Sequence, residues 1–234
     1  MDHEYRQHDH LDLRSYGRRR GRKLSPRQER LIGEVLPRVG LDLTSPASTE
    51  LAGLFDPPKP QVWLEIGFGG GEHLIWQAQH NPDTGCIGCE PFEEGVVKVL
   101  TAIEEQHLGN IRLYPDDARA VLRWLPPASI DRAFILFPDP WPKTKHRKRR
   151  LVNAATLALL ASAMKPGAEL RLGTDIGDYA RTMLVALQAT PEFRWTAQCA
   201  DDWRIRPADW PETRYEQKAV REGRKSSYLR FARV

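Results

Sequence analysis

The chain has 234 residues, of which 41% are hydrophobic and 28% charged, and its formal net charge at pH 7 is +4. This length and apolar content suit one α/β domain with extensions, and no apolar run is long enough to span a membrane. Three cysteines are too few for the disulfide framework of a small secreted protein, and the charged N-terminus is unlike a signal peptide, so a cytoplasmic protein is expected.

Residues 1–24 are polar and rich in Arg, His and Asp, with a basic cluster at Arg18–Lys23. Such a segment buries too little apolar surface to order itself, so we predict a flexible basic N-terminal arm. Ser25 and Pro26 are typical of a helix start, with an N-cap residue followed by proline at the first helical position. A single domain is therefore expected over residues 25–234.

From Gln61 onward, short apolar runs alternate with segments of helical periodicity. This alternation predicts a doubly wound, mainly parallel sheet with helices on both faces. The predicted strands are residues 62–66, 86–89, 111–114, 130–137, 169–172, 193–198 and 227–231. The predicted helices among them are residues 72–79, 92–107, 118–125, 151–164 and 178–188, and the segment between the last two strands is predicted to be a loop.

The segment Val62–Glu72 combines a short strand, a glycine-rich turn and the start of a helix. Glycines at 67, 69 and 71 suit positive φ angles and close approach of the backbone to a ligand, and the helix N-terminus offers unpaired N–H groups. Glu90 follows the next strand, where an acidic side chain can accept hydrogen bonds from ribose hydroxyls. The turn alone is equally compatible with a tight turn that binds nothing.

Glu65 is unusual, because a central parallel strand is buried on both faces and is expected to be apolar. A buried carboxylate is costly unless a cationic or hydrogen-bonding group meets it, and the ammonium group of a bound amino acid would do so. Together with the glycine turn and Glu90, this residue indicates a nucleoside joined to an amino acid. S-adenosylmethionine fits that description better than NAD. The competing interpretation is a half-exposed Glu65 beside an empty turn.

Carboxylates recur where the predicted strands end, and in an open α/β sheet these ends gather at the edge where ligands bind. One such acid would mean little, since solvated loops also carry acids, but five equivalent positions favour a site. They are Glu65, Glu90, Asp117, Asp139 and Asp175. Cys86 and Cys89 are three apart on a strand and point to opposite faces, so we expect core residues and no metal site.

The loop after the fourth strand is the richest of these positions. Its three prolines stiffen the chain around Asp139 and Trp141, and seven of the eight residues Lys143–Arg150 are cationic or, like His, can become so. Charge runs are usually solvated surface. This run, however, adjoins the predicted cofactor site and is accompanied by the Arg18–Lys23 cluster. We therefore expect a nucleic-acid substrate, bound through its phosphates, with Trp141 able to stack on a base.

Several motifs resemble the tRNA (guanine-N7-)-methyltransferases, most closely the bacterial, single-subunit form. They are Leu64–Gly69, Pro138–Trp141 with Lys143 and Lys148–Arg150, Gly173–Asp175, Thr213–Glu216 and the arm near Arg14–Arg22. The likeness covers nearly the whole chain after about residue 14. It implies a Rossmann-like class I methyltransferase that transfers a methyl group from S-adenosylmethionine to N7 of the variable-loop guanine at tRNA position 46. The products would be N7-methylguanosine and S-adenosylhomocysteine.

The resemblance also implies roles for individual residues, with Asp139 as the catalytic residue. S-adenosylmethionine would be bound by Glu65, Gly67, Gly69, Glu90, Asp117, Ala118 and Asp139. The guanine would be contacted by Lys143, Asp175, Thr213, Arg214, Tyr215 and Glu216. The remaining RNA would be contacted by Lys145, His146, Arg147, Lys148, Arg149 and Arg150. The expected partner is tRNA, and neither a metal, a membrane nor an obligate protein partner is expected.

Two other functions remain open at this point. An NAD(P)-dependent oxidoreductase would share the fold and Glu90, but it explains neither Glu65 nor the basic clusters. A non-catalytic RNA-binding protein explains the basic clusters but not the glycine turn. The role of Asp139 is also open among recognition of guanine, stabilisation of positive charge, and capping of the Pro-Trp turn.

Overall fold

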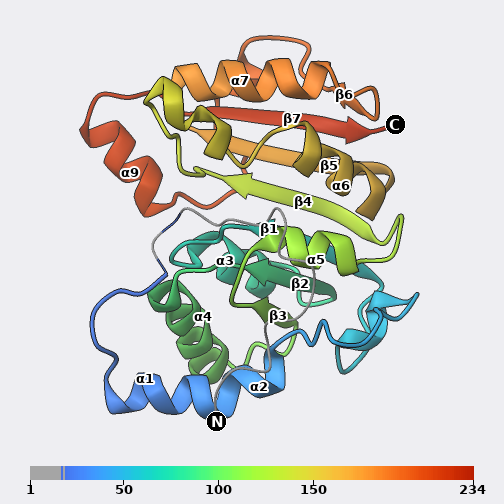
Figure 1. Ribbon diagram of the computed structural model, residues 1–234, viewed down its shortest axis with the longest axis vertical. Coiled ribbons are helices and arrows are strands. Elements are labelled where there is room, and N and C mark those ends of the chain that lie inside the picture. The colour runs from blue at the N-terminus through green and yellow to red at the C-terminus, as the bar shows by residue number, and fades with distance from the viewer. Residues whose placement is uncertain (1–16, 18) are drawn as a thin grey trace.

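A seven-stranded sheet forms the centre of the computed structural model, which describes residues 17 and 19–234 (Figure 1). Its strand order is β3-β2-β1-β4-β5-β7-β6. All neighbours are parallel except the pairs that β7 makes with β5 and β6. The strands are β1 (Gln61–Ile66), β2 (Thr84–Cys89), β3 (Ile111–Tyr114), β4 (Ile130–Leu136), β5 (Met164–Thr174), β6 (Phe193–Trp195) and β7 (Ser227–Arg233). The predicted doubly wound, mainly parallel sheet is confirmed.

Helices cover both faces of this sheet. They are α1 (Pro26–Arg30), α2 (Leu36–Val39), α3 (Glu72–His80), α4 (Glu93–Gln106), α5 (Ala118–Trp124), α6 (Ala154–Ala163), α7 (Gly177–Gln188), α8 (Asp201–Arg204) and α9 (Arg214–Arg221). A π-helical stretch, Leu31–Val35, joins α1 to α2. The predicted start of α1 is confirmed, because Ser25 caps it in a reciprocal capping box with Gln28.

The two faces bury separate hydrophobic clusters. On one face, strand residues such as Leu64 pack with Leu157 of α6 and Met183 of α7. On the other face, Leu74 of α3 and Leu100 of α4 pack over β2 and β3. Burial on both faces explains the nearly continuous apolar pattern of the central strands. None of the described helices is both long and apolar enough to cross a membrane.

Some predicted boundaries differ from the structure. The fourth strand ends at Leu136 and not at Phe137, because Phe137 takes a left-handed φ of 49°. The following helix begins at Ala154, after Asn153, whose side chain accepts a hydrogen bond from the backbone of Thr156. The loop predicted between the last two strands is wrong, since that segment contains α8 and α9. A Thr213-x-x-Glu216 capping box starts α9, and this signature was visible in the sequence.

The predicted N-terminal arm falls mostly outside the described residues, which omit 1–16 and 18. Its last residues contact the domain. The Arg19 guanidinium lies 2.5 Å from a carboxylate oxygen of Asp116. The Arg22 backbone N–H donates to Glu94, and the Arg19 carbonyl accepts from the N–H of Glu93, both at the start of α4. The division into an arm and one domain stays a prediction.

Candidate functional site

The turn after β1 is built from three glycines in the left-handed region. The φ angles of Gly67, Gly69 and Gly71 are 74°, 55° and 80°, values that side chains with a Cβ rarely adopt. A Cβ on Gly71 would lie 2.3 Å from the Val99 side chain, and one on Gly95 would lie 2.0 Å from the Gly69 carbonyl oxygen. The predicted turn is therefore confirmed, and Gly71 and Gly95 allow it to pack closely against α4.

A cavity of about 470 Å³ opens beside this turn. It lies at the ends of β1, β2 and β4, where the strand order reverses, and this switch point is where open α/β sheets bind ligands. Its volume is within the roughly 300–1,000 Å³ that is usual for small-molecule sites. The predicted site residues that line it are Gly67, Gly69, Glu90, Asp117, Ala118, Asp139, Lys148, Arg149, Arg150 and Tyr215.

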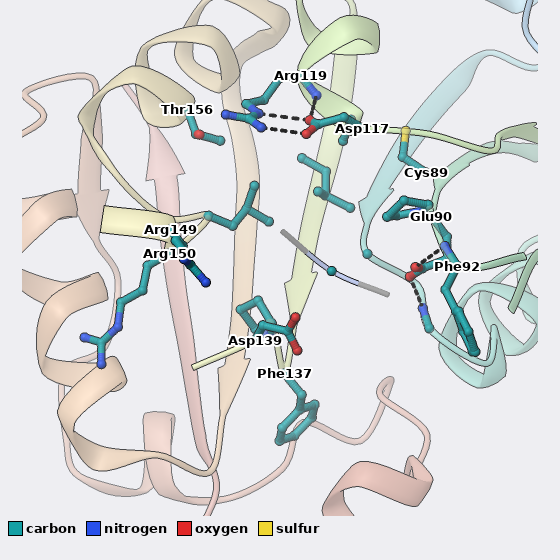
Figure 2. Close-up of a pocket in the computed structure, with 18 of the residues that line it drawn as sticks. Cys89, Glu90, Phe92, Asp117, Arg119, Phe137, Asp139, Arg149, Arg150 and Thr156 are labelled. Atoms are coloured by element: carbon teal, nitrogen blue, oxygen red, sulfur yellow. Dashed lines mark hydrogen bonds and ion pairs between the residues drawn. The ribbon is translucent and has the colours of Figure 1, made fainter. Parts of the chain in front are cut away.

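Glu90 forms one wall of the cavity (Figure 2). Its two carboxylate oxygens accept hydrogen bonds from the backbone N–H groups of Gly69, at 2.8 Å, and Phe92, at 2.9 Å. Burial raises the pKa of Glu90, and these two hydrogen bonds oppose the shift. Because each carboxylate oxygen can accept more than one hydrogen bond, Glu90 can hold the turn and still accept from ligand hydroxyls.

Asp117 caps α5 at another wall of the cavity. It accepts a hydrogen bond from the backbone of Arg119 at 3.0 Å, and its other oxygen lies 2.6 Å from the Arg119 guanidinium. Burial opposes ionisation, but these contacts with Arg119 hold the pKa of Asp117 below its usual value. Ala118 is the first residue of α5, so its backbone N–H has no acceptor within the helix.

Asp139 faces the cavity from the loop after β4 (Figure 2). Phe137 and Trp141 flank it with φ angles of 49° and 40°, a left-handed conformation that is strained for residues other than glycine. The Phe137 N–H donates to the Gly173 carbonyl at 2.7 Å, which fixes the start of the loop. Burial raises the pKa of Asp139. The loop thus holds the Asp139 carboxylate at the cavity in a strained, stiffened segment.

Arg150 anchors the far end of this loop and is only 3% exposed. Its guanidinium donates to the Pro140 carbonyl at 2.9 Å and to Thr182 at 2.5 Å, and it pairs with Asp178 at 2.5 Å. It also lies 4.7 Å from the centroid of the Tyr179 ring. Figure 2 shows that the side chain points away from the cavity. The charge of Arg150 is therefore used inside the protein, and we do not carry the predicted RNA contact of Arg150 further.

The rest of the basic run lies at the surface or at the cavity rim. Thr144–Arg149 forms a 3₁₀ helix that follows Lys143. Arg149 lies over the Trp141 ring at 4.9 Å, and His146 meets the same ring edge-on at 6.0 Å. The exposed members are Lys143, Lys145, Arg147 and Lys148. The sequence run therefore separates into one buried arginine and a mostly exposed basic surface.

Glu65 is buried under the glycine turn and does not line the cavity. Its carboxylate lies 2.7 Å from Nδ1 of His73, and Nε2 of His73 lies 3.1 Å from the amide nitrogen of Gln77. That amide also donates to the carbonyl of Asp209 at 2.8 Å. Since an amide nitrogen only donates, His73 accepts at Nε2 and donates to Glu65 from Nδ1. Glu65 thus has His73 as its partner within the protein, whereas the sequence analysis expected a ligand ammonium.

The four residues Thr213–Glu216 do not all lie at the cavity. Of these four residues, only Tyr215 lines the cavity, where a Cβ on Gly69 would lie 3.0 Å from its hydroxyl oxygen. Arg214 instead pairs with Glu72 at 3.2 Å. A helical turn therefore places Tyr215 and Glu216 on different sides of α9.

The remaining predicted guanine contacts have partners within the protein. Glu216 is 3% exposed, accepts from the Thr213 backbone at 3.1 Å, and accepts from the Tyr228 hydroxyl at 2.5 Å. Asp175 pairs with Arg224 at 2.7 Å and does not line the cavity. The structure does not bring Thr213, Asp175 or Glu216 to the cavity beside Asp139.

The sequence reasoning missed several residues at the cavity, including the following three. Gly17 lines it from the N-terminal segment, and Arg119 lines it as the partner of Asp117. Thr156 also lines it, and its buried hydroxyl has no hydrogen-bond partner among the described residues. Only Arg119 had a sequence signal, because it follows an N-cap aspartate by two residues. Cys86 and Cys89 are buried and unpaired, which confirms their predicted core role.

Known proteins resemble the chain in sequence and in fold. A family profile described as a putative methyltransferase matches residues 59–229. A tRNA (guanine-N(7)-)-methyltransferase of Chelativorans sp. (strain BNC1) is 48% identical over 94% of this chain and 94% of that protein. A protein of the same name from Rhodospirillum rubrum is 49% identical over 95% of this chain and 88% of that protein.

Solved structures support the same architecture. The 16S rRNA methyltransferase KamB superposes with a TM-score of 0.58 at 17% identity, covering 82% of this chain and 96% of that chain. An antibiotic-related methyltransferase superposes with a TM-score of 0.53 at 20% identity, covering the same shares of the two chains. At such identities the likeness concerns the fold alone, and it agrees with the predicted Rossmann-like class I methyltransferase.

The buried position of Arg150 predicts a stability difference within the basic run. Arg150→Met should lower the free energy of unfolding by about 3 kcal/mol, because it removes the hydrogen bonds that the buried guanidinium donates to Pro140, Thr182 and Asp178. Arg147→Met is the matched control, since Arg147 pairs with the same Asp178 at 3.0 Å but is exposed, and exposed ion pairs contribute little. Urea unfolding measures both variants, and equal losses of stability would contradict the anchoring role.

Proposed function

Because the chain belongs to the tRNA (guanine-N7-)-methyltransferase family, we infer that it transfers a methyl group from S-adenosylmethionine to N7 of a guanine in tRNA. The products are N7-methylguanosine and S-adenosylhomocysteine. The observation that carries this function is the cavity at the strand-order switch, which joins the glycine turn, Glu90 and Asp139 in a chain of this family. The two alternative functions, an NAD(P)-dependent oxidoreductase and a non-catalytic RNA-binding protein, do not agree with membership of this family.

The cavity residues fit the donor molecule. Glu90 offers acceptors for two ribose hydroxyls, and the left-handed glycine turn leaves its backbone free of side chains beside them. Asp117 is held ionised by Arg119 and can accept from an exocyclic amino group, while the N–H of Ala118 can donate to a ring nitrogen. We therefore propose Gly67, Gly69, Glu90, Asp117 and Ala118 as the binding residues, and we assign Glu65 to support of the turn through His73.

The chemistry requires positioning more than proton transfer. When bound, S-adenosylmethionine supplies a methyl group on a sulfonium, which is already a strong electrophile. Guanine N7 has an exposed lone pair, so no base is needed to create the nucleophile. As the N7–carbon bond forms and the sulfur–carbon bond breaks, positive charge moves to the purine. Holding the two groups in line lowers the barrier by several kcal/mol.

We assign the catalytic role to Asp139. A carboxylate beside the purine stabilises the positive charge that develops there, and it does so more in the transition state than in the ground state. It can also accept from N1–H and N2–H, which guanine presents together. The strained, proline-stiffened loop and the Arg150 anchor keep this carboxylate in place. Lys143, at the end of the same loop, and Tyr215 are proposed to contact the guanine.

We propose that the tRNA backbone lies across the exposed basic surface formed by Lys145, Arg147 and Lys148, with Arg149 and His146 beside Trp141. Lys and Arg side chains supply the phosphate contacts that dominate nucleic-acid affinity. The basic cluster of the N-terminal arm, residues 1–24, would add to this attraction. By family likeness, the target is the variable-loop guanine at position 46.

The role of Glu90 predicts weaker donor binding when its charge is removed. Glu90→Gln should lower the affinity for S-adenosylmethionine at least tenfold, because charge-assisted hydrogen bonds are lost and an amide group faces backbone donors. Calorimetric titration measures the affinity. Glu105→Gln, an exposed residue of α4, is the control. Unchanged affinity in Glu90→Gln would remove this residue from the donor site.

The role of Asp139 predicts a loss of methyl transfer without a loss of donor binding. Asp139→Asn should nearly abolish the reaction, because the charge disappears and the new amide donors meet the donor edge of guanine. N7-methylguanine becomes labile to aniline after borohydride reduction, so strand scission maps the modified nucleotide. Scission at another base would reject the N7 product, and a fully active Asp139→Asn enzyme would place catalysis elsewhere.

The exposed basic surface predicts a change in salt dependence. Replacing Lys145 and Arg147 by alanine should weaken tRNA binding and reduce the slope of log K against log salt by roughly one to two units. Replacing Lys98 and Arg123, exposed on α4 and α5, removes the same charge elsewhere and should leave the slope nearly unchanged. Equal slopes in both double variants would make the run ordinary solvated surface.

A further inference from the structure

A second cavity, of about 770 Å³, lies on the other side of α9 from the methyl-transfer cavity. The two cavities share α9 as a wall, since Tyr215 lines the first and Glu216 the second. Ser227, at the start of β7, lines the second cavity and pairs with Thr174, at the end of β5. Figure 1 shows α9 at the edge of the sheet toward which β4 points. Both cavities therefore open at the same edge of the sheet.

Basic side chains dominate the lining of the second cavity. Arg204, Arg206, Arg224 and Lys225 contribute four cations, against the acids Glu212 and Glu216. Glu216 is buried and already accepts hydrogen bonds from Tyr228 and Thr213. Arg224 pairs with Asp175, and Arg206 lies 3.6 Å from Glu216, which leaves the exposed Arg204 and Lys225 as the cations of the mouth. Such a mouth attracts a polyanion.

An aromatic platform lies within the same cavity. Trp203 is half-buried, and the Arg204 guanidinium lies 4.7 Å from the centroid of the Trp203 ring. Arg206 is oriented by a hydrogen bond that it donates to the Trp210 carbonyl at 3.1 Å. A stacked indole and guanidinium beside an exposed cation such as Lys225 is a combination that binds unpaired nucleotides, with the base on the flat groups and the phosphate on the cation.

We propose that this second cavity binds an unpaired nucleotide of the tRNA that adjoins the target guanine. The proposal rests on the proposed function, because it takes the RNA to be the methyl acceptor in the first cavity. The shared wall supplies the geometry: a strand that leaves a guanine beside Tyr215 meets the basic mouth on the other side of α9. Stacking and phosphate contacts do not distinguish one base from another, so this site holds the RNA strand without selecting a sequence.

The first test is a pair of double variants that remove equal charge. Arg204→Ala with Lys225→Ala should raise KM for tRNA at least fivefold and lower the salt slope by about 1.4, from two single-strand phosphate contacts. It should leave kcat at saturating tRNA and the affinity for S-adenosylmethionine unchanged. The control, Lys98→Ala with Arg123→Ala, should change none of these quantities. An equal KM and slope in the two double variants would overturn the proposal.

The second test examines the platform. Trp203→Leu should raise KM for tRNA at least fivefold, and Trp203→Phe should restore most of the affinity, because stacking needs an aromatic face. Thermal unfolding of both variants checks that the fold is kept. Equal KM values for Trp203→Leu and Trp203→Phe would overturn the proposal. A fall in kcat together with weaker S-adenosylmethionine binding would also overturn it, because it would show that Trp203 only supports the fold. Absence of tRNA methylation by the wild-type protein would instead refute the proposed function.

Discussion

The position of Asp139 depends on the buried guanidinium of Arg150. Burying a charge costs several kcal/mol unless it is paired and hydrogen-bonded, and here Asp178, Thr182 and the Pro140 carbonyl satisfy it. In return, the guanidinium fixes the chain on the carboxyl side of Asp139. The left-handed residues on either side of Asp139 persist because the surrounding contacts determine their conformation. The Asp139 carboxylate is therefore held by a guanidinium that points away from the cavity.

A second buried polar chain supports the opposite side of the switch point. It runs from Glu65 through His73 and Gln77 to the carbonyl of Asp209, and the Asp209 carboxylate pairs with the buried Arg171 at 2.9 Å. This chain links the strand that enters the glycine turn with the loop that leads into α9. The hydrogen bonds and ion pairs within this network offset the cost of burying polar side chains in an otherwise apolar sheet.

The parts of the fold that were predicted correctly rest on local physics. Strand and helix periodicities, the proline at the start of α1 and the left-handed turn at Gly67 depend on residues close together in sequence. The sequence also predicted correctly that Glu90, Asp117 and Asp139 lie near one another, because the carboxyl ends of parallel strands lie at the same edge of a sheet. Helix α9 was missed because the surrounding segment is rich in charge and proline and was therefore predicted to be a loop. The Thr213–Glu216 capping box, which marks the start of the helix, was not taken into account. Its amphipathic pattern is short, so composition outweighed periodicity.

The sequence by itself determined the alternation of elements, the glycine turn, the acids at the strand ends and the family. Only the tertiary structure decided which charges face inward. Arg150 and Lys145 belong to one basic run, yet the first is buried against α7 and the second is exposed. Glu65 likewise meets His73, although the sequence alone left Glu65 open to a ligand. Whether a charged side chain is buried, and which residue it pairs with, depends on residues that are far apart in the sequence and are brought together by packing. A local sequence pattern does not contain this information.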